Sequence, residues 1–129
     1  MRLHANIKPV VPVELFRTAQ HALASADHYD LLIIDGPART SKGTLEIALV
    51  VNLVVQPTGA SLDDLRPAVR EFHALTQAGV PKHKLIFALN HIGTEAEAND
   101  ARAYLTEAGY AILSGHLPER PGYRQAQNL

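Results

Sequence analysis

The sequence contains no cysteine. This absence excludes disulfide bonds, thiolate metal ligands and a cysteine nucleophile, and it fits a protein from a reducing compartment. Long hydrophobic runs are also lacking, because none reaches the roughly 18 residues of a membrane-spanning helix. The first nine residues, MRLHANIKP, have no apolar core of the kind found in signal peptides. We therefore expect a cytoplasmic protein with no membrane partner.

An excess of charge of either sign is missing as well. The formal net charge is −1, so the overall charge does not favour binding to nucleic acid or to a membrane surface. What the chain does have is 47% hydrophobic residues among 129, which is enough for one core. We expect residues 1–129 to form a single α/β domain.

Continuous apolar runs predict the strands of this domain. None of the three strongest runs alternates polar with apolar residues, which is typical of parallel strands that are covered on both faces. The most secure of them lies in residues 29–37 (YDLLIIDGP), which predict a buried parallel strand ending in an acidic turn. The runs are residues 31–34 (LLII), 50–55 (VVNLVV) and 85–89 (LIFAL), with weaker candidates at 10–13 (VVPV) and 110–113 (YAIL).

Helical patterns fall between these runs. Ser61 and the acidic residues after it predict the start of one helix, although Pro67 inside its pattern indicates a kink or a later start. Alternating strands and helices favour a layered α/β fold, with a mainly parallel sheet, helices on both faces and right-handed crossovers. The expected helices span residues 14–26, 61–78, 95–108 and 121–128.

Asp35 stands at the end of the most secure strand and is followed by Gly36. An acid at this position is typical of a Walker B motif, in which the carboxylate holds Mg²⁺ directly or through water. A turn without further function is the alternative, since Asp-Gly-Pro favours turns. Residues 36–44 could also be compared with a phosphate loop, but Ser41 and Gly43 occupy two positions where that motif needs glycine and a hydroxyl.

Several stretches in order resemble the ParA/MinD-type partition ATPases, which are P-loop NTPases with a deviant Walker A motif. The resemblance is strongest to the small plasmid-partition members and covers most of the chain, from about Pro9 to Leu129. It depends on four motifs, none decisive alone. They are the strand YDLLIIDGP, the segment VVQPTGASLDD, the strand LIFALNHIG and the final piece LPERPGYRQAQNL.

The resemblance implies a nucleotide site for ATP and Mg²⁺. Asp35 would be the Walker B acid, acting in catalysis and on the metal through water, and Gly36 would offer its amide near the terminal phosphate. Asn90 would hydrogen-bond the adenine, with Leu117 and Pro118 lining the base pocket. Family members form homodimers, bind DNA nonspecifically and respond to a centromere-binding partner protein, and these properties are expectations here.

The departures from the family pattern are as informative as the matches. No K-G-G-x-G-K-[ST] loop precedes Asp35, the family's last helix is absent, and His91 replaces a basic residue. Because that loop supplies most of the contacts to a triphosphate, we expect this truncated relative not to bind or hydrolyse ATP alone. A missing first strand would leave an open sheet edge, which favours self-association.

Other functions remain as alternatives. The chain could be a non-catalytic interaction module that binds a full-length ATPase or its partner, or an unrelated flavodoxin-like domain in which Asp35 serves another ligand. Metal and hydrolase sites are poorly supported, because HExxH, G-x-S-x-G and G-x-G-x-x-G motifs are all absent. The seven histidines are therefore expected to be surface residues.

Overall fold

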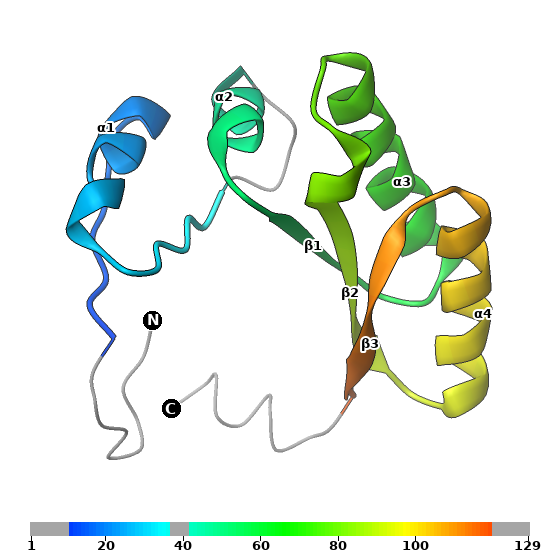
Figure 1. Ribbon diagram of the computed structural model, residues 1–129. Helices are drawn as coiled ribbons and strands as arrows, with labels where there is room; N and C mark the ends of the chain where they lie inside the picture. The colour runs from blue at the N-terminus through cyan, green and yellow to red at the C-terminus, as the bar shows by residue number, and fades with distance from the viewer. Residues whose placement is uncertain (1–10, 37–41, 120–129) are drawn as a thin grey trace.

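A computed structural model describes residues 11–36 and 42–119 (Figure 1). Its centre is a sheet of three parallel strands in the order β1-β2-β3, which confirms the α/β class. Figure 1 shows α3 and α4 on one side of the sheet and α1 on the other, while α2 lies near the upper end of β1 and adds Ala48 to the core. The elements are α1 (Ala19–Ala24), the 3-10 turn η1 (Ala26–His28), α2 (Lys42–Val50), β1 (Val54–Thr58), α3 (Leu62–Gln77), the 3-10 turn η2 (Lys82–Lys84), β2 (Leu85–Ile92), α4 (Glu95–Glu107) and β3 (Ala111–Pro118).

The main core lies between the sheet and the helices α3 and α4. Alternate side chains of β2, from Leu85, Phe87 and Leu89, are buried on this face, and Ile112 of β3 packs beside them. Phe72 of α3 stacks on Phe87 with ring centroids 4.3 Å apart. Continuous apolar strands and amphipathic helices thus form the layers that their sequence patterns predict.

Tyr110 closes one end of this core. Its ring meets those of Phe72 and Phe87 edge-on, with centroids 5.4 Å and 5.7 Å away. Its hydroxyl group is hydrogen-bonded to Nδ1 of His73, so the one polar atom of this buried side chain has a partner. The ammonium group of Lys82 lies 4.8 Å from the ring centroid, which is within range of a cation–π contact.

Helices α3 and α4 begin where the sequence predicts. The backbone N–H of Asp64 donates to Oγ of Ser61 at 3.2 Å, which confirms Ser61 as an N-cap. Pro67 neither ends α3 nor delays its start, because the helix runs without interruption from Leu62 to Gln77. The predicted helix over residues 95–108 is confirmed as α4, and the strands predicted over 85–89 and 110–113 are confirmed as β2 and β3.

Two predicted elements have different bounds in the structure. The helix expected over residues 14–26 is reduced to α1, because Thr18 caps it and the preceding Leu15 is fully exposed with nothing to pack against. The strand expected over residues 50–55 begins later. Helix α2 extends through Val50, and β1 spans Val54–Thr58.

The prediction of a buried parallel strand over residues 29–37 is wrong for its described part. Residues 31–36 pair with no strand, and the side chains of Leu31 and Ile33 are 76% and 81% exposed. The composition of residues 31–34 is typical of a strand that is covered on both faces. Among the described residues, however, no strand pairs with this segment and no layer of side chains covers it. Residues 11–13 likewise form no strand.

The remaining expectations concern residues outside the described ranges. The helix expected over 121–128 lies there, as does the first residue of the candidate strand 10–13. Among residues 11–36 and 42–119, no helix combines the length and hydrophobicity needed to cross a membrane.

Candidate functional site

The carboxyl ends of β2 and β3 meet at one edge of the sheet. Ile92 pairs with Pro118, and the backbone N–H of Glu119 donates to the carbonyl of Ile92 at 2.9 Å. This pairing brings Asn90 to the same edge as Leu117 and Pro118. Three of the residues that the resemblance assigns to a base pocket are therefore neighbours in space, although 27 positions separate Asn90 from Leu117 in the sequence.

Asn90 is half-buried and lies on the sheet face that α3 and α4 do not cover. It shares this face with Ile86 and Ala88, two and one strand periods before it, while Leu89 points into the core. Leu117 is exposed and Pro118 half-buried at the end of β3. The edge thus combines one amide, which can donate and accept hydrogen bonds, with accessible apolar surface.

His91 has an unusual backbone conformation at this edge. Its φ is 52°, the only positive value at a non-glycine residue in the described part of the chain. The pairing of β2 with β3 shifts register between Leu89 and Ile92, so this residue sits in an irregular stretch of the strand. Its Nδ1 lies 2.8 Å from Oε2 of Glu119. Bulges and strained positions of this kind re-aim side chains beside functional sites.

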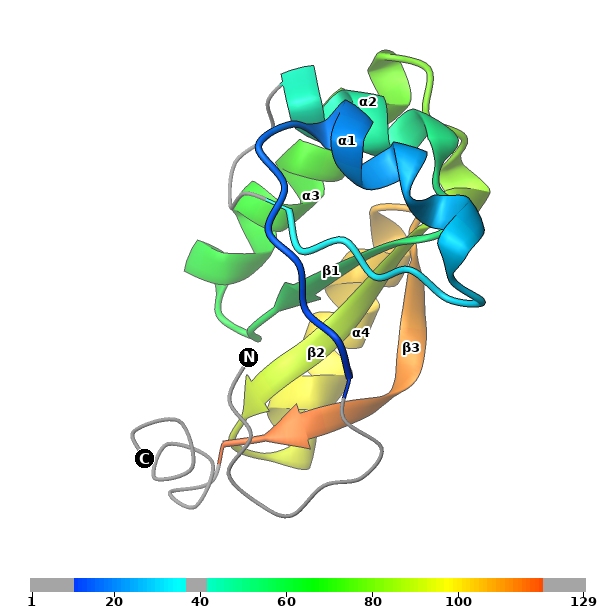
Figure 2. The same cartoon turned by 90° about the vertical axis from the view of Figure 1, so that its left-hand side faces the viewer.

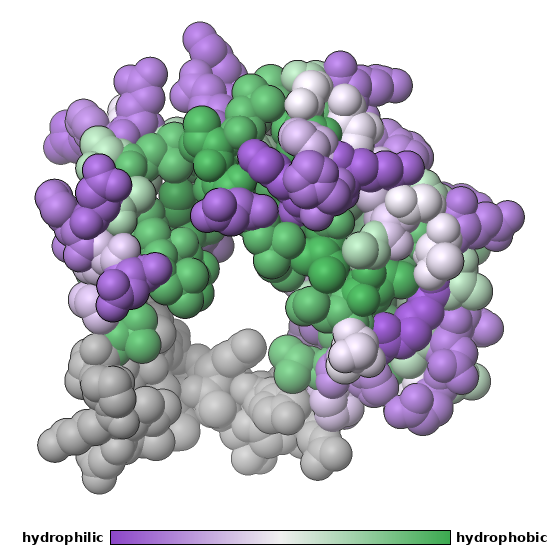
Figure 3. Space-filling view, in the orientation of Figure 1, coloured by the Kyte–Doolittle hydropathy of each residue, from purple (hydrophilic) through white to green (hydrophobic). Residues whose placement is uncertain are grey.

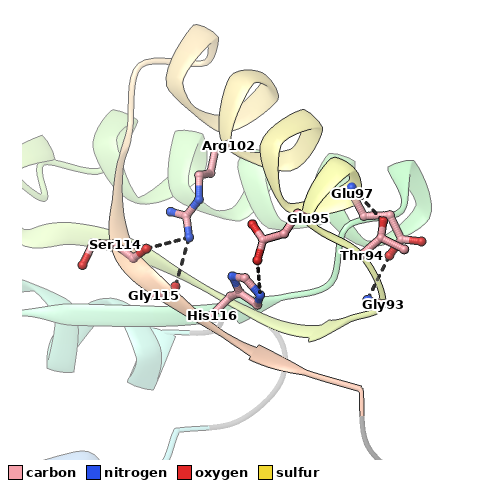
Figure 4. A network of polar contacts seen from close by, with 8 residues as sticks. All are labelled: Gly93, Thr94, Glu95, Glu97, Arg102, Ser114, Gly115 and His116. Atoms are coloured by element: carbon pink, nitrogen blue, oxygen red, sulfur yellow. Dashed lines mark hydrogen bonds and ion pairs between the residues drawn. The ribbon is translucent and has the colours of Figure 1, made fainter.

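Arg102 of α4 fastens the irregular part of β3 to the helix layer (Figure 4). Its guanidinium group donates to the carbonyls of Leu113 at 2.8 Å, Ser114 at 2.9 Å and Gly115 at 3.2 Å. These carbonyls belong to the stretch of β3 where its pairing with β2 is irregular. One charged side chain thereby satisfies three backbone acceptors and fixes the path of β3 toward Leu117.

His116 and Glu95 form a second link between β3 and α4. Nε2 of His116 lies 3.7 Å from Oε1 of Glu95, and the two side chains face each other in Figure 4. Sequence reasoning singled out neither this pair nor Arg102, because both depend on the register of β3 against α4. No short sequence motif predicts how β3 is aligned with α4.

The N-termini of α3 and α4 also lie beyond strand ends, where anions often bind in α/β folds. Both are closed by their own side chains. At α4, Thr94 accepts from the N–H of Glu97, and the Glu97 carboxylate accepts from the N–H of Gly93 at 3.0 Å. At α3, the Asp64 carboxylate accepts from the hydroxyl of Ser61 at 3.0 Å. A carboxylate at each helix start repels phosphate, so neither end offers a phosphate site.

Asp35 and Gly36 are not brought to this edge. Both are exposed and end the unpaired segment that follows η1. In Figures 1 and 2 this cyan segment runs toward α2, whereas β2 and β3 end at the opposite, lower part of the molecule. A Cβ atom built on Gly36 would meet no heavy atom within 4 Å, so no close backbone approach requires glycine here.

The positions of Asn90, Leu117 and Asp35 determine whether the described residues fit a bound Mg·ATP. Asn90 and Leu117 suit the base end of such a ligand, whereas Pro118 pairs with the core-facing Ile92 and so lies toward the face that the helices cover. The described residues provide no matching phosphate end. Within residues 11–36 and 42–119 there is also no group of three or more histidine, aspartate or glutamate side chains that could hold a metal ion. The described chain therefore does not fit a complete Mg·ATP site.

The fold and this edge define a parallel α/β domain with a half-buried amide, Asn90, and the exposed Leu117 at the carboxyl ends of its strands. Comparison with protein families finds no family model that matches the chain, and no curated protein is significantly similar in sequence.

Proposed function

We propose that the chain is the central and C-terminal part of a ParA-type DNA-partition ATPase, carrying the base side of its nucleotide site. The observation that supports this most is the adjacency of Asn90 to Leu117 and Pro118 at the carboxyl edge of the sheet. Ligands of open parallel sheets bind at this edge. The order of β1, α3, β2, α4 and β3 also matches the order of the motifs on which the resemblance depends.

The base end can be derived from the side chains present. The Asn90 amide offers both a donor and an acceptor, which suits the alternating donor and acceptor groups along the edge of an adenine ring. Leu117, which alternates with Pro118 and lies on the same face as Asn90, offers apolar surface for the face of the ring. The links from Arg102 and from His116 to Glu95 hold the strand that carries Leu117.

The phosphate end needs groups that lie outside this arrangement. In a complete family domain Asp35 and Gly36 would serve Mg²⁺ and the terminal phosphate, and a preceding K-G-G-x-G-K-[ST] loop would supply most of the phosphate contacts. ATP would then drive dimerisation and nonspecific DNA binding, and a centromere-binding partner would stimulate hydrolysis. The chain alone is proposed to lack ATP binding and ATPase activity.

The reading frame upstream of the Met1 codon tests this proposal. We expect the DNA immediately before that codon to encode, in frame, a strand followed by K-G-G-x-G-K-[ST]. Sequencing the genomic locus decides it. An in-frame stop codon a short distance upstream, with no such motif between it and Met1, would contradict the proposal.

A non-catalytic interaction module in the cytoplasm is the second candidate. It is favoured by the large apolar side chains that the structure leaves exposed before the sheet, on Leu15, Leu31 and Ile33. Exposed apolar surface of this kind marks protein-binding sites in many proteins. The same upstream stop codon that would contradict the ATPase fragment would favour this module.

A further inference from the structure

Strands β2 and β3 pair in a register that changes along their length. Phe87 pairs with Ile112 and Leu89 pairs with His116, so β3 advances by four residues while β2 advances by two. Two extra residues of β3 are accommodated between these pairs, which makes the stretch 113–115 a bulge. The bulge therefore decides which part of β3 reaches the carboxyl end of β2.

Arg102 of α4 supplies hydrogen-bond donors to this bulge. Residues 113–115 have no pairing partner in β2. The Arg102 guanidinium group donates to the carbonyls of all three, and Figure 4 shows its contacts with Ser114 and Gly115. A guanidinium group presents several donors in one rigid plane, and hydrogen bonds from a charged group are stronger than neutral ones. Arg102 thus replaces the bonds that a continuous strand ladder would give this stretch.

A continuous register would fit the side-chain pattern of β3 equally well. Without the bulge, β3 would slide by two residues, about 6–7 Å, and Ser114 instead of His116 would lie opposite Leu89. Side chains alternate with a period of two, so this slide leaves every side chain of β3 on its present face. Both residues that could lie opposite Leu89 are polar. The core therefore does not select one register over the other.

The uncovered face of the sheet does not select a register either. Leu113 and Leu117 alternate with the core-facing residues of β3 and are 43% and 61% exposed. Hydrophobic residues line the right-hand side of the central opening in Figure 3, where the strands lie in Figure 1. A leucine of β3 would remain exposed on this face in either register, so the burial of apolar surface favours neither.

We propose that Arg102 selects the bulged register and thereby places Leu117 beside Asn90. In the observed register the residue after Leu117 pairs with Ile92, which puts Leu117 next to Asn90 on the uncovered face. In the continuous register Gly115 would take this place, and Leu117 would lie beyond the end of β2. Arg102 is therefore a positioning residue. The role of Leu117 in base binding rests on the proposed function, whereas the choice of register does not.

Arg102 can act as a fixed anchor because α4 is firmly packed. Its neighbours Ala101 and Leu105 are fully buried in the core, and Thr94 caps the start of the helix. Removing the guanidinium group would leave three backbone acceptors without their donor. A slide to the continuous register would pair part of them with N–H groups of β2, which reduces the cost of the loss. We therefore expect β3 to slide when Arg102 is replaced.

Disulfide trapping in the full chain tests the register directly. The sequence contains no cysteine, so two introduced cysteines can pair only with each other within one chain. Adjacent positions on neighbouring strands have the separation that a disulfide needs. Asn90→Cys with Leu117→Cys reports the bulged register, and Asn90→Cys with Gly115→Cys reports the continuous one. With Arg102 present, we expect the first pair to crosslink and the second not to crosslink.

Replacing Arg102 should reverse this preference. In Arg102→Ala, the ratio of the 90–117 crosslink to the 90–115 crosslink is expected to fall by about tenfold or more, because charge-assisted hydrogen bonds are lost. Arg102→Lys keeps the charge but not the planar fork, and it should give an intermediate ratio. Arg70→Ala is the matched control. Arg70 is exposed on α3, so its replacement should leave the ratio unchanged.

A third cysteine pair shows whether the sheet is intact. Ile86→Cys with Ala111→Cys joins residues that pair before the bulge, so it should crosslink in every variant. An Arg102→Ala protein that forms this crosslink and keeps the original 90–117 preference would overturn the proposal. Loss of the 86–111 crosslink in both Arg102 variants would overturn it too, because Arg102 would then hold the whole sheet. No measurement here uses nucleotide, so the outcome is independent of the proposed ATPase role.

Discussion

Replacing Phe72 with alanine is expected to lower the free energy of unfolding by about 3–5 kcal/mol. The Phe72 side chain is 0% exposed and lies at the centre of the core between α3 and the sheet. Its ring contacts those of Phe87 and Tyr110, so truncation leaves a cavity that two rigid rings cannot easily fill. Since small domains have a total stability of about 5–15 kcal/mol, this single change removes a large fraction of it.

Urea denaturation followed by circular dichroism measures this loss. Phe16→Ala is the matched control, because it removes the same side chain from an exposed position outside the core cluster. It is expected to change stability by about 0.5 kcal/mol or less. Equal effects of the two substitutions would show that Phe72 does not lie in the main core.

Replacing Pro67 with alanine is expected to raise the free energy of unfolding by about 1–3 kcal/mol. Pro67 lies in the interior of α3, where it cannot donate the backbone hydrogen bond to the residue four positions earlier. Its side chain is exposed, so alanine opens no cavity. The gain is reduced by the greater freedom that alanine gives the unfolded chain, about 0.4–1 kcal/mol.

Thermal unfolding should show a midpoint several degrees higher for Pro67→Ala. Pro81→Ala provides the control. Pro81 precedes η2 with φ −61°, a value that suits proline, and no helix needs its N–H. Its replacement is expected to leave the midpoint unchanged or lower it slightly. A lower midpoint for Pro67→Ala would mean that the proline ring has a stabilising contact that outweighs the missing hydrogen bond.

The second half of the fold could be predicted because its signals are local. Ser61 and its following acidic residues mark the start of α3, the glycines after α3 and α4 mark their ends, and the run before Asn90 forms β2. Each of these features involves residues only a few positions apart. These signals therefore predict the same helix and strand boundaries regardless of how the rest of the chain folds.

The strand expected over residues 31–34 failed for the opposite reason. Its composition shows what environment the segment suits, but a strand exists only where a neighbouring strand supplies hydrogen bonds. The described residues contain no such neighbour, so Leu31 and Ile33 remain exposed. The same failure separates Asp35 and Gly36 from the carboxyl edge, because their place at a strand end depended on that strand.

At the candidate site, the residues named from the resemblance could be located in the sequence, whereas the additional residues found in the structure could not. Asn90, Leu117 and Pro118 follow apolar runs, and such positions can be read from the sequence. The left-handed conformation of His91 and the carbonyl contacts of Arg102 arise from the irregular pairing of β2 with β3. Such irregularities are set by register across the sheet, which a single sequence does not encode in a short motif.

Titration of the chain with a fluorescent ATP analogue, with and without Mg²⁺, tests the central claim most directly. The claim is that this chain carries the base side of a nucleotide site without a phosphate side. Carboxylates close the N-termini of α3 and α4, and the segment after η1, which contains Asp35, runs toward α2 and away from the ends of β2 and β3. Mg²⁺ should therefore have nothing to bridge. We predict no Mg²⁺-dependent binding at micromolar analogue. Micromolar binding that requires Mg²⁺ and is lost in Asp35→Ala would contradict the account.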